Sequence, residues 1–182
     1  MLSRTWIAVV AVACQFQPER VDQAVEPRLD GDVSQAADSN VSHAADATIQ
    51  WSDVIVVNEI AAGGVPDDWF EVMNRSFEDL DLSALYFTDD LAGAPTRAQF
   101  RPGTIVVARG HLQVVVTNAW PGFQLASDEE LTLVAPDGVT VIDRVDWAQG
   151  DSPDGGSYGR MPDGSGLFQT LTSPTPGAPN SP

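Results

Sequence analysis

Hydrophobic residues fall into short runs from Trp51 onward, and turn-forming residues separate these runs. The runs are rich in valine, isoleucine, leucine and aromatic residues, and Gly, Pro, Asp or Asn closes most of them. Such runs are typical of β-strands, because β-branched and aromatic side chains pack well on a pleated surface. The pattern predicts strands at 54–60, 69–74, 85–88, 104–107, 112–117, 131–134 and 139–145.

Turn motifs between the runs strengthen this interpretation. Pro136-Asp137-Gly138 lies between two expected strands, and Pro162-Asp163-Gly164 repeats the motif near the end of the chain. Glycine supplies the positive φ that a tight turn requires. Arg109-Gly110 is a further candidate for a hairpin bend. No segment of ten or more residues shows helical periodicity, so we expect an all-β fold, an antiparallel sandwich or barrel.

The N-terminus has a different pattern, which resembles a secretory signal. Met1–Arg4 is short and positively charged, Trp6–Ala13 is entirely apolar, and polar residues follow from Gln15. A basic start, an apolar run and small residues before a cut are the layout of a signal peptide. The alternative is a buried N-terminal strand or helix, but a long polar segment separates this run from the expected strands. We therefore expect a signal peptide at residues 1–13.

Two kinds of cleavage fit this sequence. Ala11 and Ala13 match an ordinary secretory site, whereas the run from Ala11 to Cys14 resembles a bacterial lipoprotein lipobox, in which the cysteine receives lipid. Cys14 is the only cysteine in the chain, so no intramolecular disulfide is possible. Stable anchoring takes more than one acyl chain, and a diacylated or triacylated cysteine meets this requirement. We favour lipidation at Cys14 over simple secretion.

The resemblance to a lipobox implies export and a lipid anchor in a bacterial cell envelope. Gln15 follows the cysteine, in place of the aspartate that is linked to retention in the inner membrane. We therefore expect the outer membrane or the cell surface of a Gram-negative bacterium. No stretch approaches the roughly 20 apolar residues of a spanning helix, so the lipid on Cys14 is the expected contact with the membrane.

Residues 14–50 show no hydrophobic periodicity and predict a disordered acidic tether. Alanine, aspartate, serine and glutamine dominate, and aromatic residues are missing between Phe16 and Trp51. Such a stretch cannot bury enough apolar area to offset its ordering entropy. Its root-mean-square reach would be roughly 30 Å. Asp30 and Asp32 suggest a calcium loop as an alternative, but the spacing and the terminal glutamate of an EF-hand are missing.

Motifs in the strand-rich part of the chain resemble the lamin tail domain family. The resemblance covers about Val54 to Asn180, and its stretches follow the family's order. These stretches are Val57–Ile60, Asp68–Asn74, Asp81–Ser83, Phe100–Thr104, Ser157–Gly164 and Pro174–Asn180. The motif residues are Asn58, Glu59, Trp69, Glu71, Asn74, Tyr158, Gly159, Arg160, Pro176 and Gly177. The resemblance implies an immunoglobulin-like antiparallel β-sandwich over residues 51–180, similar to modules of secreted and surface proteins in bacteria.

Polar residues interrupt two of the expected strands. Asn58 and Glu59 lie in an apolar run, and buried polar groups must be hydrogen-bonded to be tolerated. We expect their side chains to hold a neighbouring loop, such as the one that carries Asp67-Asp68. Glu71 lies between two apolar neighbours, and strand alternation directs it to the opposite side, toward solvent.

The sequence gives little support to catalysis, and we expect no enzyme activity. Glu59 and Glu71 could form the carboxylate pair of a glycosidase, but no recognisable cleft accompanies them. The two histidines, His43 and His111, lie in the expected tether and at a strand start, and no G-x-S-x-G elbow precedes a helix. Two histidines so placed are too few for a zinc site without help from cysteine.

The net charge of the chain limits the classes of partner that it can bind. With 9 basic and 26 acidic residues the formal net charge is −17, a field that repels nucleic acid. Calcium is the one cofactor that we retain as an alternative, because Asp89, Asp90, Asp151 and Asp154 lie in oxygen-rich loops. The competing interpretation is turn chemistry, in which each aspartate caps its own loop.

The expected function is that of a lipid-anchored, non-catalytic interaction or structural module. Its partner would be an unknown protein or an envelope polymer, bound through loops or an edge strand. The alternatives are a calcium- or carbohydrate-binding domain and, with less support, a hydrolase. Trp69 and Trp147 belong most simply in the core or between sheets. Exposure of Trp120 beside Trp147 would favour carbohydrate binding, and a deep cleft with two carboxylates would favour hydrolysis.

Overall fold

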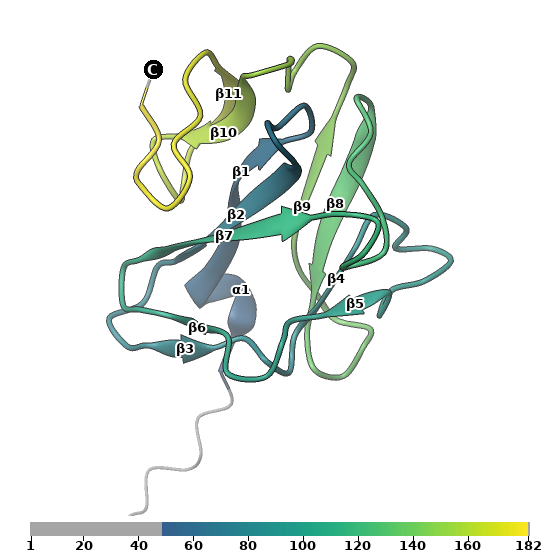
Figure 1. Cartoon of the computed structure of the whole chain (residues 1–182). Helices are drawn as coiled ribbons and strands as arrows, with labels where there is room; N and C mark the ends of the chain where they lie inside the picture. The colour runs from purple at the N-terminus through teal and green to yellow at the C-terminus, as the bar shows by residue number, and fades with distance from the viewer. Residues whose placement is uncertain (1–48, 182) are drawn as a thin grey trace, which may run out of the picture. The chain divides into compact units, whose positions relative to one another are not determined.

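The computed structural model describes residues 49–181, and these form eleven strands and one helical turn (Figure 1). Cys14, the expected signal peptide and nearly all of the expected tether lie outside the described residues. The helical turn is α1 (Trp51–Val54). The strands are β1 (Ile55–Ala61), β2 (Asp68–Asn74), β3 (Leu80–Asp81), β4 (Tyr86–Thr88), β5 (Ala98–Gln99), β6 (Ile105–Val106), β7 (His111–Val116), β8 (Glu129–Val134), β9 (Val141–Trp147), β10 (Ser157–Met161) and β11 (Leu167–Leu171).

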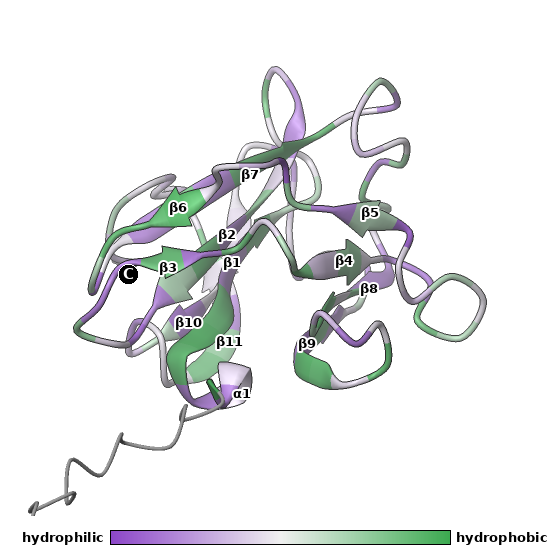
Figure 2. Cartoon of the chain, turned by 90° about the horizontal axis from the view of Figure 1, so that it is seen from below, coloured by the Kyte–Doolittle hydropathy of each residue, from purple (hydrophilic) through white to green (hydrophobic). Residues whose placement is uncertain are grey.

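Two antiparallel sheets form the layers of a sandwich. The larger sheet has the strand order β11-β10-β1-β2-β7, and the facing sheet has the order β5-β4-β8-β9. Strands β3 and β6 form a small third sheet. Figure 2 shows the two larger sheets as separate layers. The expected all-β fold with antiparallel sheets is confirmed, while an immunoglobulin-like topology stays a prediction.

In the part of the chain that the structure covers, no helix has the length and apolar character needed to cross a bilayer.

The hydrophobic core lies between the two sheets. Alternate residues of β1 and β2 point into it, and rings from both layers meet there, with Phe70 and Phe87 centred 5.1 Å apart. Trp147 is 1% exposed and belongs to this core, as expected. Trp69 is also buried, but strand alternation places it on the opposite face of β2 from Phe70, outside the central cluster.

All seven expected strands are present, although several bounds differ by a few residues. The sequence pattern missed β3, β5, β10 and β11. The first two contain two residues each, which is too short for any period to show. The other two contain Gly159, Arg160, Gln169 and Thr170, and glycine and these polar side chains weaken the pattern of a half-buried strand.

Both expected glycine turns are hairpins. Gly138 has φ +74° and joins the paired strands β8 and β9, and Gly164 has φ +65° and joins β10 to β11. The expected hairpin at Arg109-Gly110 is wrong. Arg109 does adopt a positive φ of 59°, but β6 pairs with β3 whereas β7 pairs with β2. The bend therefore carries the chain from one sheet to another.

A β-bulge in β1 prepares the site described below. The register with β2 shifts between Val57 and Glu59, so Asn58 is an extra residue without a partner. An extra residue lets two successive side chains lie on the same side of a strand. Val57 and Ile60 therefore both point into the core, while Asn58 and Glu59 lie together on the outer face of the larger sheet.

Candidate functional site: a carboxylate cluster beneath the C-terminal segment

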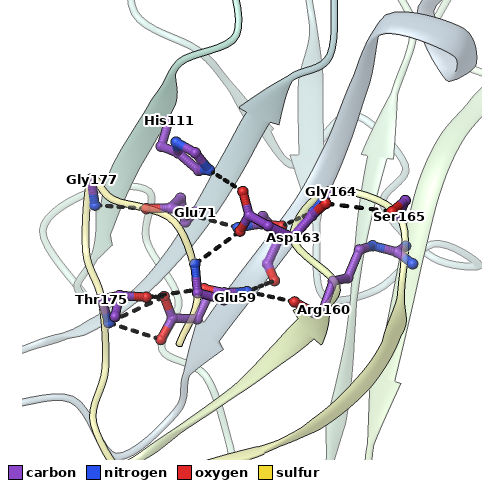
Figure 3. Close-up of polar contacts among 11 residues, drawn as sticks. Glu59, Glu71, His111, Arg160, Asp163, Gly164, Ser165, Thr175 and Gly177 are labelled. Atoms are coloured by element: carbon purple, nitrogen blue, oxygen red, sulfur yellow. Dashed lines mark hydrogen bonds and ion pairs between the residues drawn. The ribbon is translucent and has the colours of Figure 1, made fainter. Parts of the chain in front are cut away.

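Polar side chains gather on the outer face of the larger sheet, beneath residues 172–181, which we call the C-terminal segment (Figure 3). We name the following five residues the buried polar cluster: Asn58, Glu59, Glu71, Asp163 and Asn180. Glu59 and Glu71 lie directly opposite each other on β1 and β2, and both are 0% exposed. The cluster therefore combines two sheet strands, the β10–β11 turn and the C-terminal segment.

Asn58 links three of these parts. Its Nδ2 donates to Glu71 Oε1 at 3.0 Å and to Asp163 Oδ1 at 2.9 Å. Its Oδ1 accepts from the main-chain N of Gly164 at 2.8 Å. Both functions of the amide are thus used, and the bulge residue fixes the β10–β11 turn against β2.

Glu59 holds the C-terminal segment. Its carboxylate accepts from the main-chain N of Thr175 at 3.1 Å, from Thr175 Oγ1 at 2.9 Å and from the hydroxyl of Ser157. The expectation that Asn58 and Glu59 are hydrogen-bonded is confirmed. The expected partner, the Asp67-Asp68 loop, is wrong, because these side chains hold the β10–β11 turn and the C-terminal segment.

Glu71 does not point to solvent, and that prediction is wrong. Strand alternation does direct its side chain away from the core, but the C-terminal segment covers it there. The main-chain N of Gly177 donates to Glu71 Oε2 at 2.6 Å. Burial raises the pKa of Glu71 to about 7, against the hydrogen bonds from Asn58 and Gly177 and the charge of His111. The nearby Glu59 carboxylate adds to the rise.

Asp163 pairs with a histidine that sequence reasoning did not connect to the site. His111 Nε2 lies 2.7 Å from Asp163 Oδ2, and its side chain is only 7% exposed. Burial acts to raise the pKa of Asp163, but hydrogen bonds from Asn180, Asn58 and His111 bring it below its usual range. No local signal in the sequence links His111 to a turn 52 residues away.

Asn180 fastens the end of the C-terminal segment. Its main-chain N donates to Asp163 Oδ1 at 2.9 Å, and its Nδ2 donates to the carbonyl oxygens of Asn58 and Arg160 at 3.1 and 3.0 Å. The close approach of the Asn180 side chain to β10 requires glycine at position 159. A Cβ atom on Gly159 would lie 2.7 Å from Asn180 Nδ2 and 2.7 Å from a methyl carbon of Leu171.

Arg160 connects the two layers of the sandwich. Its Nη2 donates to both carboxylate oxygens of Asp143 on β9, at 3.1 and 3.0 Å. Its Nε donates to the carbonyl oxygen of Val57 at 2.9 Å. The guanidinium also lies 4.5 Å from the ring centre of Phe168, on which Tyr158 stacks.

The remaining motif residues lie outside the cluster. Asn74 Nδ2 donates to the carbonyl oxygens of Glu78, Val106 and Val107, and so ties the end of β2 to the small sheet of β3 and β6. Trp69 and Pro176 line one groove on the outer face.

The four calcium candidates occupy ordinary turns. Asp89 pairs with Arg97, Asp90 Oδ1 accepts from a main-chain N three residues later, and Asp151 Oδ2 accepts from the main chain of its own loop. Asp154 lies in the loop beside Gly63. Among residues 49–181, no three His, Cys, Asp or Glu side chains come together as metal ligands. Calcium binding at these loops stays a prediction.

The two tryptophans proposed as a sugar platform do not form one. Trp147 is buried, and its Nε1 donates to the carbonyl oxygen of Ala126 at 2.9 Å. Trp120 is half-buried and packs beside Phe87 and Arg101. Only one of the two rings can therefore contact a ligand.

The chain matches no protein-family model, no curated protein and no solved structure. The site is therefore interpreted from its own geometry.

Proposed function

We propose that this chain is an exported, lipid-anchored protein of the cell envelope, and that its β-sandwich is a non-catalytic interaction or structural module. One observation carries the proposal. The two buried carboxylates that could have formed an acid/base pair, Glu59 and Glu71, accept hydrogen bonds from the C-terminal segment that covers them.

The chemistry of catalysis explains why this matters. A carboxylate that transfers a proton must come within hydrogen-bond reach of a substrate atom. Here Glu59 and Glu71 are 0% exposed, and main-chain N–H groups of Thr175 and Gly177 occupy their oxygens. This arrangement supports a role in architecture, in which two carboxylates fix a segment without regular secondary structure to the sheet.

The resemblance to lamin tail domains supports the same role. The shared motif includes Asn58, Glu59, Glu71, Gly159 and Gly177, and each of these contacts or is contacted by a segment distant in the sequence. A motif made of such residues is expected for a domain that preserves a scaffold and varies its surface. We propose on this basis that the sandwich is a lamin-tail-like domain with immunoglobulin-like topology.

The anchor is tested by replacing Cys14 with serine and fractionating cells of a Gram-negative host. We expect the unaltered chain in the envelope fraction and in the detergent phase of a two-phase separation, because acyl chains favour an apolar environment. Cys14→Ser is expected in the soluble fraction. Ser39→Ala is the control and is expected to behave like the unaltered chain. Envelope association of Cys14→Ser would show that the anchor is not on Cys14.

A further inference from the structure

The free edge of β7 is the surface through which this module would bind a partner. We propose that β7 is a docking strand, and that the partner adds to it as an extended peptide with apolar side chains and one acidic side chain. This inference rests on the proposed function, since it names the binding surface and the chemistry of the partner.

Among residues 49–181, no strand pairs with the outer side of β7, so its backbone has unpaired groups along that side. β7 is the outermost strand of the larger sheet, as Figure 2 shows. Asn74 N donates to Gly110 O at 2.9 Å, and the register with β2 continues without a shift. In an antiparallel pair, alternate residues bond to the partner. The N–H and C=O groups of His111, Gln113 and Val115 therefore point away from β2, toward the free edge.

β7 also lacks the features that normally protect an edge strand. Natural sheets block their edges with charges, proline, bulges or very short strands. The edge strand β9 carries Asp143, Arg144 and Asp146, and the edge strand β5 has only two residues. β7 has six residues, ends in three valines and contains no proline, bulge or carboxylate. Its one titratable group, His111, is engaged with Asp163.

Grooves flank this edge on both sides of the sheet. The core-side groove has a volume of about 390 Å³, and Phe100, Arg101 and Trp120 line it together with residues of β7. The outer groove has a volume of about 310 Å³ and is lined by Val65, Trp69 and two prolines of the C-terminal segment. Side chains of an added strand would alternate between the two grooves, because successive residues point to opposite faces.

The charge in the core-side groove selects an acidic side chain. The Arg101 guanidinium lies 4.3 Å from the ring centre of Trp120, and within residues 49–181 no carboxylate lies within salt-bridge distance of it. By contrast Arg97, Arg144 and Arg160 each pair with a carboxylate. An arginine presented on an aromatic face in a wall of the groove suits a glutamate or aspartate of the partner.

Charge also argues against a second copy of this chain as the occupant. The β7 strand itself, His111–Val116, contains no acidic residue. In a two-fold pairing of two β7 edges, the unpaired arginine of each copy would meet no acidic side chain from the strand added to its own β7. A partner with its own acidic residue can form an ion pair with Arg101, whereas the β7 strand of a second copy cannot.

The test uses the full chain and a labelled peptide, Thr-Val-Thr-Val-Glu-Val-Thr-Val-Thr, followed by fluorescence anisotropy. Gln113→Pro removes one outward N–H, and proline is tolerated on an edge strand when its N–H faces solvent. We expect the peptide to bind at least tenfold more weakly to this variant. The matched control is Thr170→Pro on β11, the opposite edge of the same sheet, where the N–H also points outward because Thr170 faces Tyr158 in a non-hydrogen-bonded pair. Its binding is expected to stay within twofold of that of the unaltered chain.

A charge exchange tests the acidic residue. Arg101→Glu is expected to weaken binding of this peptide at least tenfold, and a peptide with arginine in place of glutamate is expected to restore it to within threefold. Arg144→Glu on β9 is the control and should leave binding within twofold. Equal binding of both peptides to the unaltered chain would overturn the acidic preference.

Hydrogen exchange distinguishes the peptide from two other possible occupants of the β7 edge, which are residues 1–48 and a second copy of the chain. The amides of His111, Gln113 and Val115 are expected to exchange rapidly in the free protein and at least tenfold more slowly with saturating peptide. The proposal is overturned if Gln113→Pro binds the peptide normally. It is also overturned if these amides are already protected without peptide, either at every protein concentration, which indicates residues 1–48, or only at high concentration, which indicates a second copy. Each of these failures leaves the fractionation result for Cys14 unchanged.

Discussion

Glu71 and Asp163 belong to one hydrogen-bonded cluster, but their pKa values move in opposite directions. Burial raises the pKa of Glu71 from 4.5 to about 7. The stability that Glu71 contributes is therefore fully present below pH 4.5 and is lost as the pH rises through about 7. The pKa of Asp163 is lowered, so its contribution is present above the ordinary value of 3.8 and is lost in acid. The cluster is thus expected to be most stable in mildly acidic solution.

Glu71→Gln tests this pH dependence at a single residue. The interval from 4.5 to about 7 corresponds to roughly 3 kcal/mol. We expect the free energy of unfolding of the unaltered chain to fall by up to about this amount between pH 5 and pH 8. Glutamine cannot accept from both Asn58 and Gly177, so the variant is less stable at pH 5, and the difference narrows toward pH 8. Urea unfolding followed by tryptophan fluorescence at each pH measures both curves.

The control for this experiment is Asp128→Asn, which alters an exposed carboxylate. Its unfolding curves are expected to follow those of the unaltered chain across the same range. A constant difference between Glu71→Gln and the unaltered chain from pH 5 to pH 8 would contradict the raised pKa.

Among the elements, the C-terminal segment is fixed by side chains without being a strand or a helix. Asn180 is its last anchor, and replacement with alanine would leave the carbonyl oxygens of Asn58 and Arg160 without their side-chain donor. A buried acceptor left unsatisfied costs about 1–3 kcal/mol. We expect Asn180→Ala to lower the free energy of unfolding by roughly 2 kcal/mol. Chemical denaturation measures the loss.

Ser181→Ala is the matched control, since it removes a neighbouring polar side chain that is exposed. It is expected to change the free energy of unfolding by less than about 0.5 kcal/mol. Equal effects of the two substitutions would show that the segment is not held through Asn180.

The elements also show how far the sequence could predict this site. Asn58 and Glu59 were recognisable as buried and hydrogen-bonded, because two polar residues inside an apolar run need partners. Their partners were not recognisable, since Thr175 lies 116 residues from Glu59 and no local pattern encodes that contact. For the same reason, strand alternation correctly predicted that Glu71 lies on the outer face of the sheet but wrongly predicted that its side chain is exposed to solvent. What covers the outer face of a sheet is a tertiary property.

For the whole molecule, the relation between the two layers depends on Arg160 as well as on the core. Its guanidinium spans from β10 to Asp143 on β9, and Asp143 Oδ2 in turn accepts from the main-chain N of Val57 at 2.8 Å. Both side chains are mostly shielded from solvent, with 18% and 17% exposed. A pair held by several hydrogen bonds in this setting differs from an exposed ion pair, because removing one partner leaves a charge and main-chain groups unsatisfied.

Two arginines make this difference measurable. Arg160→Ala is expected to lower the free energy of unfolding by about 3 kcal/mol, because it leaves the Asp143 carboxylate between the layers without its ion-pair partner. Arg144→Ala removes an arginine that pairs with Glu130 at the surface, and its cost is expected to stay below about 1 kcal/mol. The double variant Arg160→Ala with Asp143→Asn should recover part of the first loss, because the two side chains interact directly. If the losses for Arg160→Ala and Asp143→Asn simply add in urea unfolding, the contact between these two side chains does not help to hold the two layers together.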